Sequence, residues 1–252
     1  MNDQNDLDTK YTAAYDAEAD IYDNRSFGSK RGELSARYKN ETVLKLLSCH
    51  GGIHENARIL DCPSGTGRIT HAIVTGDYPF GRIDAVDISE GMLKVNEAKL
   101  PAHHDKVAFT VTNMKKLKFE SGSFDGAVIA SFAYLIPQDE YKDYVADIYR
   151  VLKPGGVAVI EVSNTLCAYN PLSLVKVLKH RYLQKKKVKS SATFWEIGKL
   201  FGEFEVVEYR GAEFPMIFSN YSVYRAESKL LGGLPILKWF SGKFIVALRK
   251  PV

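Results

Sequence analysis

Short runs of apolar and β-branched residues alternate with amphipathic stretches along the middle of the chain. The first kind of run predicts strands at 57–61, 82–87, 106–112, 123–132 and 157–163. The second kind predicts helices at 68–74, 89–100 and 138–152. Strands that alternate with helices are typical of βαβ units, so the pattern predicts an α/β fold with a doubly wound, mostly parallel sheet.

The pattern is different on either side of this region. Two further strands at 204–210 and 243–249, near a short helix at 193–201, predict an antiparallel C-terminal edge on a Rossmann-like, seven-stranded sheet. Upstream, helical spacing at 40–50 predicts a helix, and the first dozen residues predict a loose polar tail.

Composition narrows the class of protein without defining it. The 252 residues are 45% hydrophobic and 25% charged, as in one large globular domain, and the net charge of +4 is too small to argue for nucleic acid. Cys49, Cys62 and Cys167 are scattered, which favours reduced thiols in the cytoplasm over a disulfide framework or a zinc site. The acidic N-terminus is unlike a signal peptide, and the longest apolar run, 126–137, is too short to span a bilayer.

The stretch "ILDCPSGTGRIT", residues 59–70, places two glycines between a strand and a helix. Gly65 and Gly67 allow a sharp turn and a close approach of a ligand, and the following helix N-terminus favours a negative group. A dinucleotide fingerprint needs a third glycine, but that position is Thr70. A tight βα turn without any ligand therefore remains an open interpretation of the glycines alone.

Two acids change the prediction. A carboxylate at Asp61 would repel a pyrophosphate by about 4 kcal/mol at about 4 Å and an effective dielectric near 20. The loop therefore suits a ligand with a positive centre, a carboxylate for the backbone amides, and a nucleoside. Asp87 ends the second strand and is placed to accept hydrogen bonds from ribose hydroxyls. The alternative for Asp87 is a solvent-facing acid near the next helix.

These residues resemble the class I S-adenosylmethionine-dependent methyltransferases, over about residues 55–163. Four pieces occur in the family's order: "ILDCPSGTGR", "AVDISEGML", "TNMKKLKFESGSFDGAVIAS" and "IYRVLKPGGVAVIEVS". The overall pattern is most similar to small-molecule methyltransferases, including the ubiquinone/menaquinone C-methyltransferase type. The chain departs from the family at Pro63 and Ser64, where many members have glycine, and at Asn113, where an acid often contacts the adenine.

The resemblance implies S-adenosylmethionine as cofactor, no metal, and a set of cofactor-binding residues. It places Asp61 and the loop 63–67 at the methionine part, Asp87 at the ribose, and Ser131 near the transferable methyl. The full predicted set is Tyr22, Arg37, Asp61, Pro63, Ser64, Gly65, Thr66, Gly67, Asp87, Ile88, Ser89, Met92, Asn113, Met114 and Ser131. Tyr22 and the pair Arg37-Tyr38 are expected to fold over the site as a lid.

The sulfonium of this cofactor already activates the methyl group, so we expect the protein mainly to align the acceptor and exclude water. Tyr134 is the candidate catalytic residue, because it follows the fourth strand. The predicted acceptor wall consists of Tyr11, Tyr15, Phe132, Tyr169 and Trp195, with Phe214 and Met216 as further apolar candidates. His71 is expected to face solvent or packing, and 103–105 is a weak metal candidate.

The predicted organisation is a lid and helical segment at 1–50, a cofactor-binding core at 51–163, a basic lid insertion at 164–192, and the rest of the sheet with acceptor elements at 193–252. The predicted function is methyl transfer to a small-molecule acceptor by a cytoplasmic monomer or homodimer, without a membrane span. The basic run 176–189 leaves RNA or protein as an alternative substrate, although a solvated lid helix explains it more simply. A non-catalytic cofactor-binding module is the other alternative, and a nicotinamide oxidoreductase is disfavoured by Asp61 and Thr70.

Overall fold

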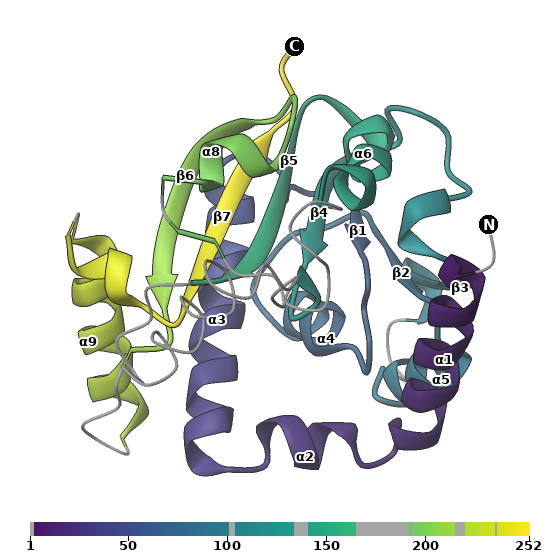
Figure 1. Cartoon of the computed structure of the whole chain (residues 1–252), viewed down its shortest axis with the longest axis horizontal. Coiled ribbons are helices and arrows are strands. Elements are labelled where there is room, and N and C mark those ends of the chain that lie inside the picture. Colours follow the sequence, from purple (N-terminus) through teal and green to yellow (C-terminus); the bar gives the residue numbers. More distant parts are fainter. Residues whose placement is uncertain are drawn as a thin grey trace.

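The computed structural model of the chain describes residues 3–100, 104–133, 141–164, 192–193, 195–214, 220–234 and 236–252. A seven-stranded sheet runs through the middle of the molecule in the order β3-β2-β1-β4-β5-β7-β6 (Figure 1). The strands are β1 Arg58–Asp61, β2 Arg82–Asp87, β3 Val107–Val111, β4 Phe124–Ile129, β5 Leu152–Ser163, β6 Glu205–Ala212 and β7 Lys243–Arg249.

The first five strands are parallel, and β7 is antiparallel to both β5 and β6. The predicted doubly wound sheet with an antiparallel C-terminal part is confirmed. The C-terminal strand β7 lies between β5 and β6, so β6 forms the edge. This order agrees with burial, because five consecutive residues of β7 are buried whereas most of β6 is only partly covered.

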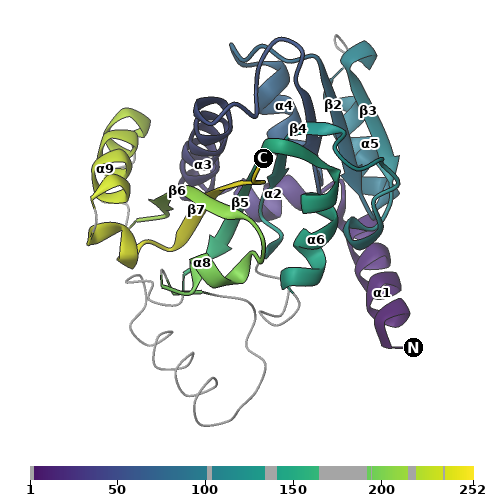
Figure 2. The same cartoon turned by 90° about the horizontal axis from the view of Figure 1, so that it is seen from above.

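Helices cover both faces of the sheet, as the view from above shows (Figure 2). One face carries α3 (Lys30–Cys49), α4 (Arg68–Val74) and α9 (Tyr221–Gly233), and the other carries α6 (Tyr141–Val151) and α8 (Ile197–Leu200). Neighbouring residues of a strand point to opposite faces of the sheet. Ile59 therefore packs in the core on the α3, α4 and α9 side, and Leu60 in the core on the α6 and α8 side. The remaining helix of the parallel region, α5 (Glu90–Ala98), follows β2.

The N-terminus differs from the prediction. The expected loose tail is wrong, since residues Asp3–Glu18 form helix α1 and Tyr22–Phe27 form α2. Helix α1 packs against α5, and α2 packs against α3 (Figure 1). The sequence of α1 has no apolar stripe, so its helical state depends on what it contacts rather than on an amphipathic pattern. Helix α9 was not among the predicted elements.

The other observed elements begin and end closer to their predicted residues. β5 begins at Leu152 rather than at the predicted residue 157, and its register with β4 shifts near this added start. Three short 3-10 turns, His104–Lys106 (η1), Met114–Lys116 (η2) and Leu237–Phe240 (η6), complete the described elements. Almost all of the basic insertion 164–192 lies outside the described residues. Within the described part of the chain, no helix combines the length and apolar character needed to cross a membrane.

Candidate functional site

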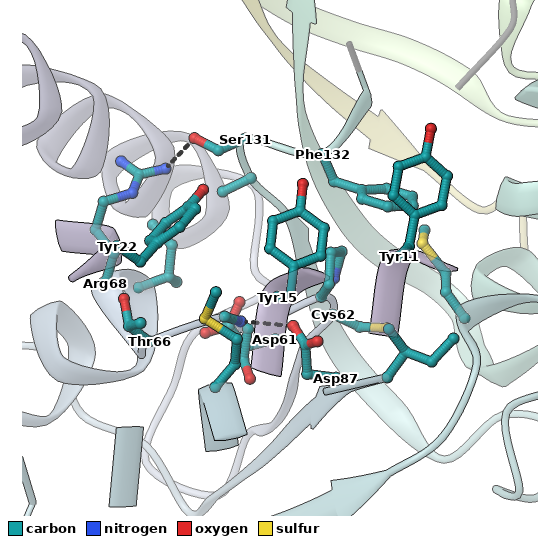
Figure 3. A pocket seen from close by; sticks show the side chains of 18 of the residues that line it. Tyr11, Tyr15, Tyr22, Asp61, Cys62, Thr66, Arg68, Asp87, Ser131 and Phe132 are labelled. Atoms are coloured by element: carbon teal, nitrogen blue, oxygen red, sulfur yellow. Dashed lines mark hydrogen bonds between the residues drawn. The ribbon is translucent and has the colours of Figure 1, made fainter. Parts of the chain in front are cut away.

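A cavity of about 1120 Å³, part of it open to solvent, lies at the carboxyl ends of β1, β2 and β4. This is where ligands bind in open α/β sheets, because the loops that follow the strands diverge there. The loops after the strands form one wall, which we call the polar half: Asp61–Thr66, Asp87, Ile88, Met92 and Thr112–Met114. Helices α1 and α2 and two further aromatic residues form the opposite wall, described below as the aromatic half (Figure 3).

The two loop glycines have different structural roles. Both adopt left-handed backbone conformations, with φ of +52° at Gly65 and +89° at Gly67. A Cβ added at Gly65 would meet nothing within 4 Å, so this glycine leaves room at the cavity wall. A Cβ added at Gly67 would lie 2.1 Å from Oδ1 of the fully buried Asn96. Gly67 is the N-cap of α4 and does not line the cavity, so it serves helix packing rather than ligand contact.

Asp61 is buried at the end of β1, with 1% of its surface exposed. Its Oδ2 accepts hydrogen bonds from the backbone N of Thr70 (3.0 Å) and from Thr70 Oγ1 (2.7 Å). Burial raises the pKa of Asp61 to about 6, although both Thr70 bonds act in the opposite direction. Thr70, the residue in the third glycine position, therefore orients Asp61 at the cavity wall, a role that the sequence did not reveal.

Asp87 joins the two loops of the polar half. Its Oδ2 accepts from the backbone N of Gly65 (2.8 Å) and its Oδ1 accepts from the backbone N of Ser89 (3.0 Å). Burial raises its pKa, opposed by these backbone donors. A carboxylate oxygen can accept more than one hydrogen bond, so Asp87 retains capacity for a ligand. Its burial excludes the interpretation as a solvent-facing acid.

Ser64 supplies an unsatisfied polar atom to the same wall. Its Oγ is buried and has no hydrogen-bond partner among the described residues. A buried hydroxyl without a partner is costly, and a polar ligand atom would remove that cost. Together with the open face of Gly65, Ser64 makes the loop suited to the polar end of a ligand.

The far end of the polar half is mostly apolar. Ile88, Met92 and Met114 line it, and Asn113 and Thr112 add polar groups. The Oδ1 of Asn113 accepts from the backbone N of Lys115 (2.8 Å), so this side chain also caps the turn η2. These residues form a largely apolar part of the cavity wall near Asp87, a surface that suits a nucleobase.

The aromatic half consists of Tyr11, Tyr15, Tyr22, Phe27, Phe132 and Tyr144. The rings of the first four follow one another along α1 and α2, with neighbouring centroids 6.2–6.5 Å apart. Phe132 follows β4 and meets Tyr144 of α6 edge to face at 5.6 Å. In Figure 3, Tyr11 and Tyr15 stand above Asp87 and Cys62. Phe27 and Tyr144 were not predicted.

Two acids attach α1 and α2 to the polar half. Asp16 Oδ1 accepts from Ser89 Oγ (2.5 Å) and from the backbone N of Gly91 (2.9 Å). Asp23 accepts from Thr66 Oγ1 (2.6 Å) and from Lys99 Nζ (2.5 Å). The two walls are thus connected by hydrogen bonds between residues about 43 to 76 positions apart in the chain.

Ser131 and Arg68 form the wall between the two halves. Ser131, the second residue after the end of β4, has a φ of +53°, an uncommon value for a residue with a side chain. Its Oγ accepts from Arg68 Nη2 (3.3 Å) and donates to Glu161 (3.3 Å). Arg68 lines the cavity and was absent from the predicted set.

The structure brings together most of the predicted residues and leaves several aside. The predicted residues that line the cavity are Tyr11, Tyr15, Tyr22, Asp61, Pro63, Ser64, Gly65, Thr66, Asp87, Ile88, Met92, Asn113, Met114, Ser131 and Phe132. Four others do not line it: Arg37, Gly67, Ser89 and Trp195. Tyr134, Tyr169, Met216 and the 176–189 run lie outside the described residues.

The predicted residues that do not line the cavity have other locations in the fold. The Arg37 guanidinium lies 3.9 Å from the centre of the Tyr221 ring and pairs with Glu41, so it belongs to the contact between α3 and α9. Tyr38 is buried against Tyr224 in the same region. Trp195 is 59% exposed. Ser89 caps α5 by accepting from the backbone N of Met92, and Phe214 is buried away from the cavity.

Two other predictions concern histidines. His71 is exposed on α4, as expected. For the metal candidate at 103–105, residue 103 and the side chain of 104 are outside the description. The described residues contain no group of three His, Cys, Asp or Glu side chains able to hold a metal ion.

Comparisons with known proteins agree with this geometry. The family profile described as "Methyltransferase domain" matches residues 59–156, which run from β1 into β5. Together with the sheet order and the loop, this match supports a class I S-adenosylmethionine-dependent methyltransferase core between β1 and β5. The resemblance found in the sequence is confirmed.

Among named relatives, the chain is similar to a demethylmenaquinone methyltransferase of Lactococcus lactis, with 39% identity over 108 residues. It is also similar to the ubiquinone/menaquinone biosynthesis C-methyltransferase UbiE of Psychromonas ingrahamii, with 36% identity over 125 residues. The matched segments span 42% and 48%, respectively, both of this chain and of the relative.

Solved structures extend the similarity of fold to most of the chain. A methyltransferase of Methanosarcina mazei has a TM-score of 0.58 and 20% identity, covering 80% of this chain and 95% of that one. The N-methyltransferase NodS of Bradyrhizobium japonicum has a TM-score of 0.57 and 13% identity, covering 86% and 96%. At these identities the likeness concerns the fold alone.

Proposed function

We propose that this protein is an S-adenosylmethionine-dependent methyltransferase that acts on a small-molecule acceptor with an apolar, aromatic part. The observation that carries the proposal is that one cavity joins the polar half, with Asp61 and Asp87, to the aromatic half. The first wall has the groups that the cofactor needs, and the second has the surface that an aromatic acceptor needs. The family match covers only the core, so the activity of the whole chain rests on this geometry as well.

In this proposal the cofactor supplies a methyl group already activated by a sulfonium, and the chain binds and orients. Asp61 pairs with the ammonium of the methionine end, and Ser64 offers its free hydroxyl nearby. Asp87 accepts from the ribose hydroxyls, while Ile88 and Met92 pack on the adenine beside Asn113 and Met114.

On the acceptor side the residues exclude water and hold a ring. Tyr15, Tyr22 and Phe132 line the cavity together with Ser131. Aromatic walls favour a planar acceptor through offset and edge-to-face contacts. Tyr134 remains a predicted acceptor contact, and the proposal does not depend on it.

The relatives indicate which acceptor to test first. Two are named for methylation in menaquinone or ubiquinone biosynthesis, so we propose a hydroquinone ring as the first acceptor class. The row of rings along α1 and α2 supports this choice, since a hydroquinone presents a flat apolar ring with polar edges. A monomer or homodimer and a cytoplasmic location also remain predictions.

Calorimetric titration with S-adenosylhomocysteine and with NAD tests the cofactor part. We expect micromolar binding of S-adenosylhomocysteine and none of NAD, and the reverse result contradicts the proposal. Turnover is then measured as S-adenosylhomocysteine release from S-adenosylmethionine, with and without 1,4-naphthalenediol. Cofactor binding without turnover on any hydroquinone, phenol or amine would support the non-catalytic module instead. No described residue favours RNA or protein as substrate.

A further inference from the structure

A group of five charged side chains lies behind the cavity wall between the polar and aromatic halves. Glu161 of β5 is fully buried and has three cations within 4 Å: Arg68 Nη2 at 2.7 Å, and the Nζ atoms of Lys39 and Lys243 at 3.8 Å each. Glu213 shares Lys39 at 2.6 Å. The group joins α3, α4, β5, β7 and the end of β6, so it is part of the fold as well as of the cavity wall.

The charges of this group are unequal. Burial opposes ionisation of Glu161, but Arg68, Lys39 and Lys243 outweigh it and hold the pKa of Glu161 well below its usual range. The pKa of Glu213 is also lowered, because Lys39 and Lys243 overcome its burial. Burial lowers the pKa of Lys243, while the two carboxylates act against that shift. With all five groups ionised, three cations face two carboxylates, and one positive charge is in excess.

Arg68 is the member of the group that reaches the cavity. Its side chain is 14% exposed and lines the cavity between Ser131 and the ring of Phe27 (Figure 3). Nη1 donates to Asn40, and Nη2 donates to Glu161 and Ser131. Within the described residues, these bonds leave Nε–H and one Nη1–H without a protein acceptor. A guanidinium stays protonated in proteins, so these are permanent charged donors.

The carboxylate of Asp61 also interacts electrostatically with the guanidinium of Arg68. In the proposed function, the ammonium of the methionine end neutralises Asp61. With that pair formed, the excess positive charge at Arg68 again lacks a partner. A partly buried cation without a counter-charge is unfavourable, so an anion at this wall stabilises the loaded site.

We propose that Arg68 binds a carboxylate or phenolate in the cavity, with Asn40 and Glu161 as the residues that position its guanidinium. This inference rests on the proposed function and extends it, because it assigns an acidic group to one of the two bound molecules. The anion has two possible sources, the carboxylate of the cofactor's methionine end or an acidic group on the acceptor. Arg68 was not in the predicted set, whereas the predicted Arg37 lies away from the cavity.

The first arm of the test compares two ligands that differ at the methionine end. S-Adenosylhomocysteine has the ammonium and the carboxylate, and 5′-methylthioadenosine has neither. If the anion belongs to the cofactor, Arg68→Gln lowers the affinity for S-adenosylhomocysteine by about tenfold or more, as expected for the loss of a charged hydrogen bond. The affinity for 5′-methylthioadenosine stays unchanged. Both affinities are measured by calorimetry.

The matched control is Arg82→Gln. Arg82, like Arg68, pairs with a carboxylate, here that of Asp84, but it is 56% exposed and lies at the start of β2, the end of that strand away from the cavity. Both variants remove one positive charge, so a general charge effect appears in each. We expect Arg82→Gln to change either affinity by less than twofold.

The second arm addresses the acceptor. In protein saturated with S-adenosylhomocysteine, 4-hydroxybenzoate and 4-hydroxybenzamide are compared as probes by ligand-observed NMR. If the anion belongs to the acceptor, the wild type binds 4-hydroxybenzoate more tightly than 4-hydroxybenzamide. Arg68→Gln then removes that preference without lowering the affinity for S-adenosylhomocysteine.

The outcomes separate the two proposals. If Arg68→Gln changes neither S-adenosylhomocysteine affinity nor probe preference, the role of Arg68 is wrong, even though the wild type binds the cofactor. If the wild type binds neither nucleoside, the proposed function itself fails. Unchanged binding of 5′-methylthioadenosine shows that the variant is folded. If Arg68→Gln does not fold, Arg68→Lys replaces it, because the lysine keeps the positive charge beside Glu161. We expect Arg68→Lys to weaken binding of the same anion several-fold, because lysine lacks the forked donors of the guanidinium.

Discussion

The polar half and the aromatic half of the cavity are built in different ways. The polar half comes from loops that directly follow β1, β2 and β3, and its key contacts, such as Gly65 N to Asp87, join core elements. The aromatic half comes mainly from α1 and α2, which are joined to the core through Asp16 and Asp23. One half is therefore continuous with the sheet, and the other is a separate layer attached to it.

This difference teaches where the protein can vary. A change in the polar half disturbs buried hydrogen bonds of the core, so we expect it to affect stability and the cofactor together. A change in α1 or α2 disturbs a less buried contact, so acceptor preference can change at a small cost in stability. The following predictions test that contrast, from the largest expected effect to the smallest.

The largest effect is expected at Gly67, which directly follows the loop of the polar half and begins α4. Gly67→Ala places a Cβ 2.1 Å from Oδ1 of buried Asn96 at a φ of +89°, so we expect a loss of about 2–3 kcal/mol in the free energy of unfolding. Gly65→Ala is the matched control, because its Cβ meets nothing within 4 Å, and it should cost only about 1 kcal/mol. Urea unfolding measures both. Equal losses would show that packing against Asn96 does not distinguish the two glycines.

The second effect concerns Asp87 and the cofactor. Asp87→Ala removes the proposed ribose acceptor and the partner of the Gly65 and Ser89 amides, so we expect S-adenosylhomocysteine to bind about 10- to 100-fold more weakly. Asp105→Ala, an exposed acid at η1, is the control. Affinity is measured by calorimetry, and an unchanged value for Asp87→Ala would remove Asp87 from the cofactor site.

The third effect is a pH dependence due to Asp61. Its pKa of about 6 in the folded state exceeds the ordinary value of 3.8, mainly through burial. The folded state therefore holds this proton more tightly, and the contribution of Asp61 to stability falls as pH rises from about 3.8 to about 6. An ammonium ligand needs the ionised carboxylate, so its affinity falls below pH 6, by up to about tenfold per unit.

Titrations of S-adenosylhomocysteine at pH 5, 6 and 7.5 measure this effect. The control is Asp61→Asn, which cannot ionise; we expect weaker binding with a flatter pH profile. If Asp61→Asn has the same profile as the wild type, another group causes the dependence, and the pairing of Asp61 with the ammonium is wrong.

The smallest effect is expected where the two halves meet. Asp23→Asn weakens the bonds from Thr66 and Lys99, and since the Asp23 side chain is 45% exposed, the loss is only about 0.5–1 kcal/mol. We expect faster amide hydrogen exchange in residues 3–27 and no change in α3. Asp20→Asn, at an exposed turn residue, is the control. Equal exchange in all three proteins would mean that Asp23 does not hold the aromatic half in place.

The polar half was largely predictable because its residues are contiguous with strand ends. An acid after β1, two glycines and an acid after β2 fall at the same sheet edge in any doubly wound fold, so their proximity follows from topology. Even there, contacts between side chains were not predictable. The sequence shows Thr70 only as a missing glycine, whereas in the structure it holds Asp61.

The aromatic half was predicted as a set of tyrosines but not as a helical layer. Tyr11 and Tyr15 were expected in the acceptor wall, yet the first dozen residues, which include Tyr11, were expected to be a loose tail. Helix α1 lacks an apolar stripe, and its hydrogen bonds to Ser89 and Gly91 involve positions more than 70 residues away. The local sequence pattern cannot predict a helix whose stability depends on contacts with residues distant in the chain.

By itself the sequence determined the sheet class, the position of the glycine loop and the two acids at the strand ends, because strand periodicity and turn chemistry are local properties. The tertiary structure alone decided which cation reaches the cavity. The sequence predicted Arg37 and not Arg68, but Arg37 packs on Tyr221 between α3 and α9, and Arg68 is held at the cavity wall by Glu161 and Asn40. The physical reason is that the charged partners of Arg68 come from elements distant in the chain, and only folding brings them together.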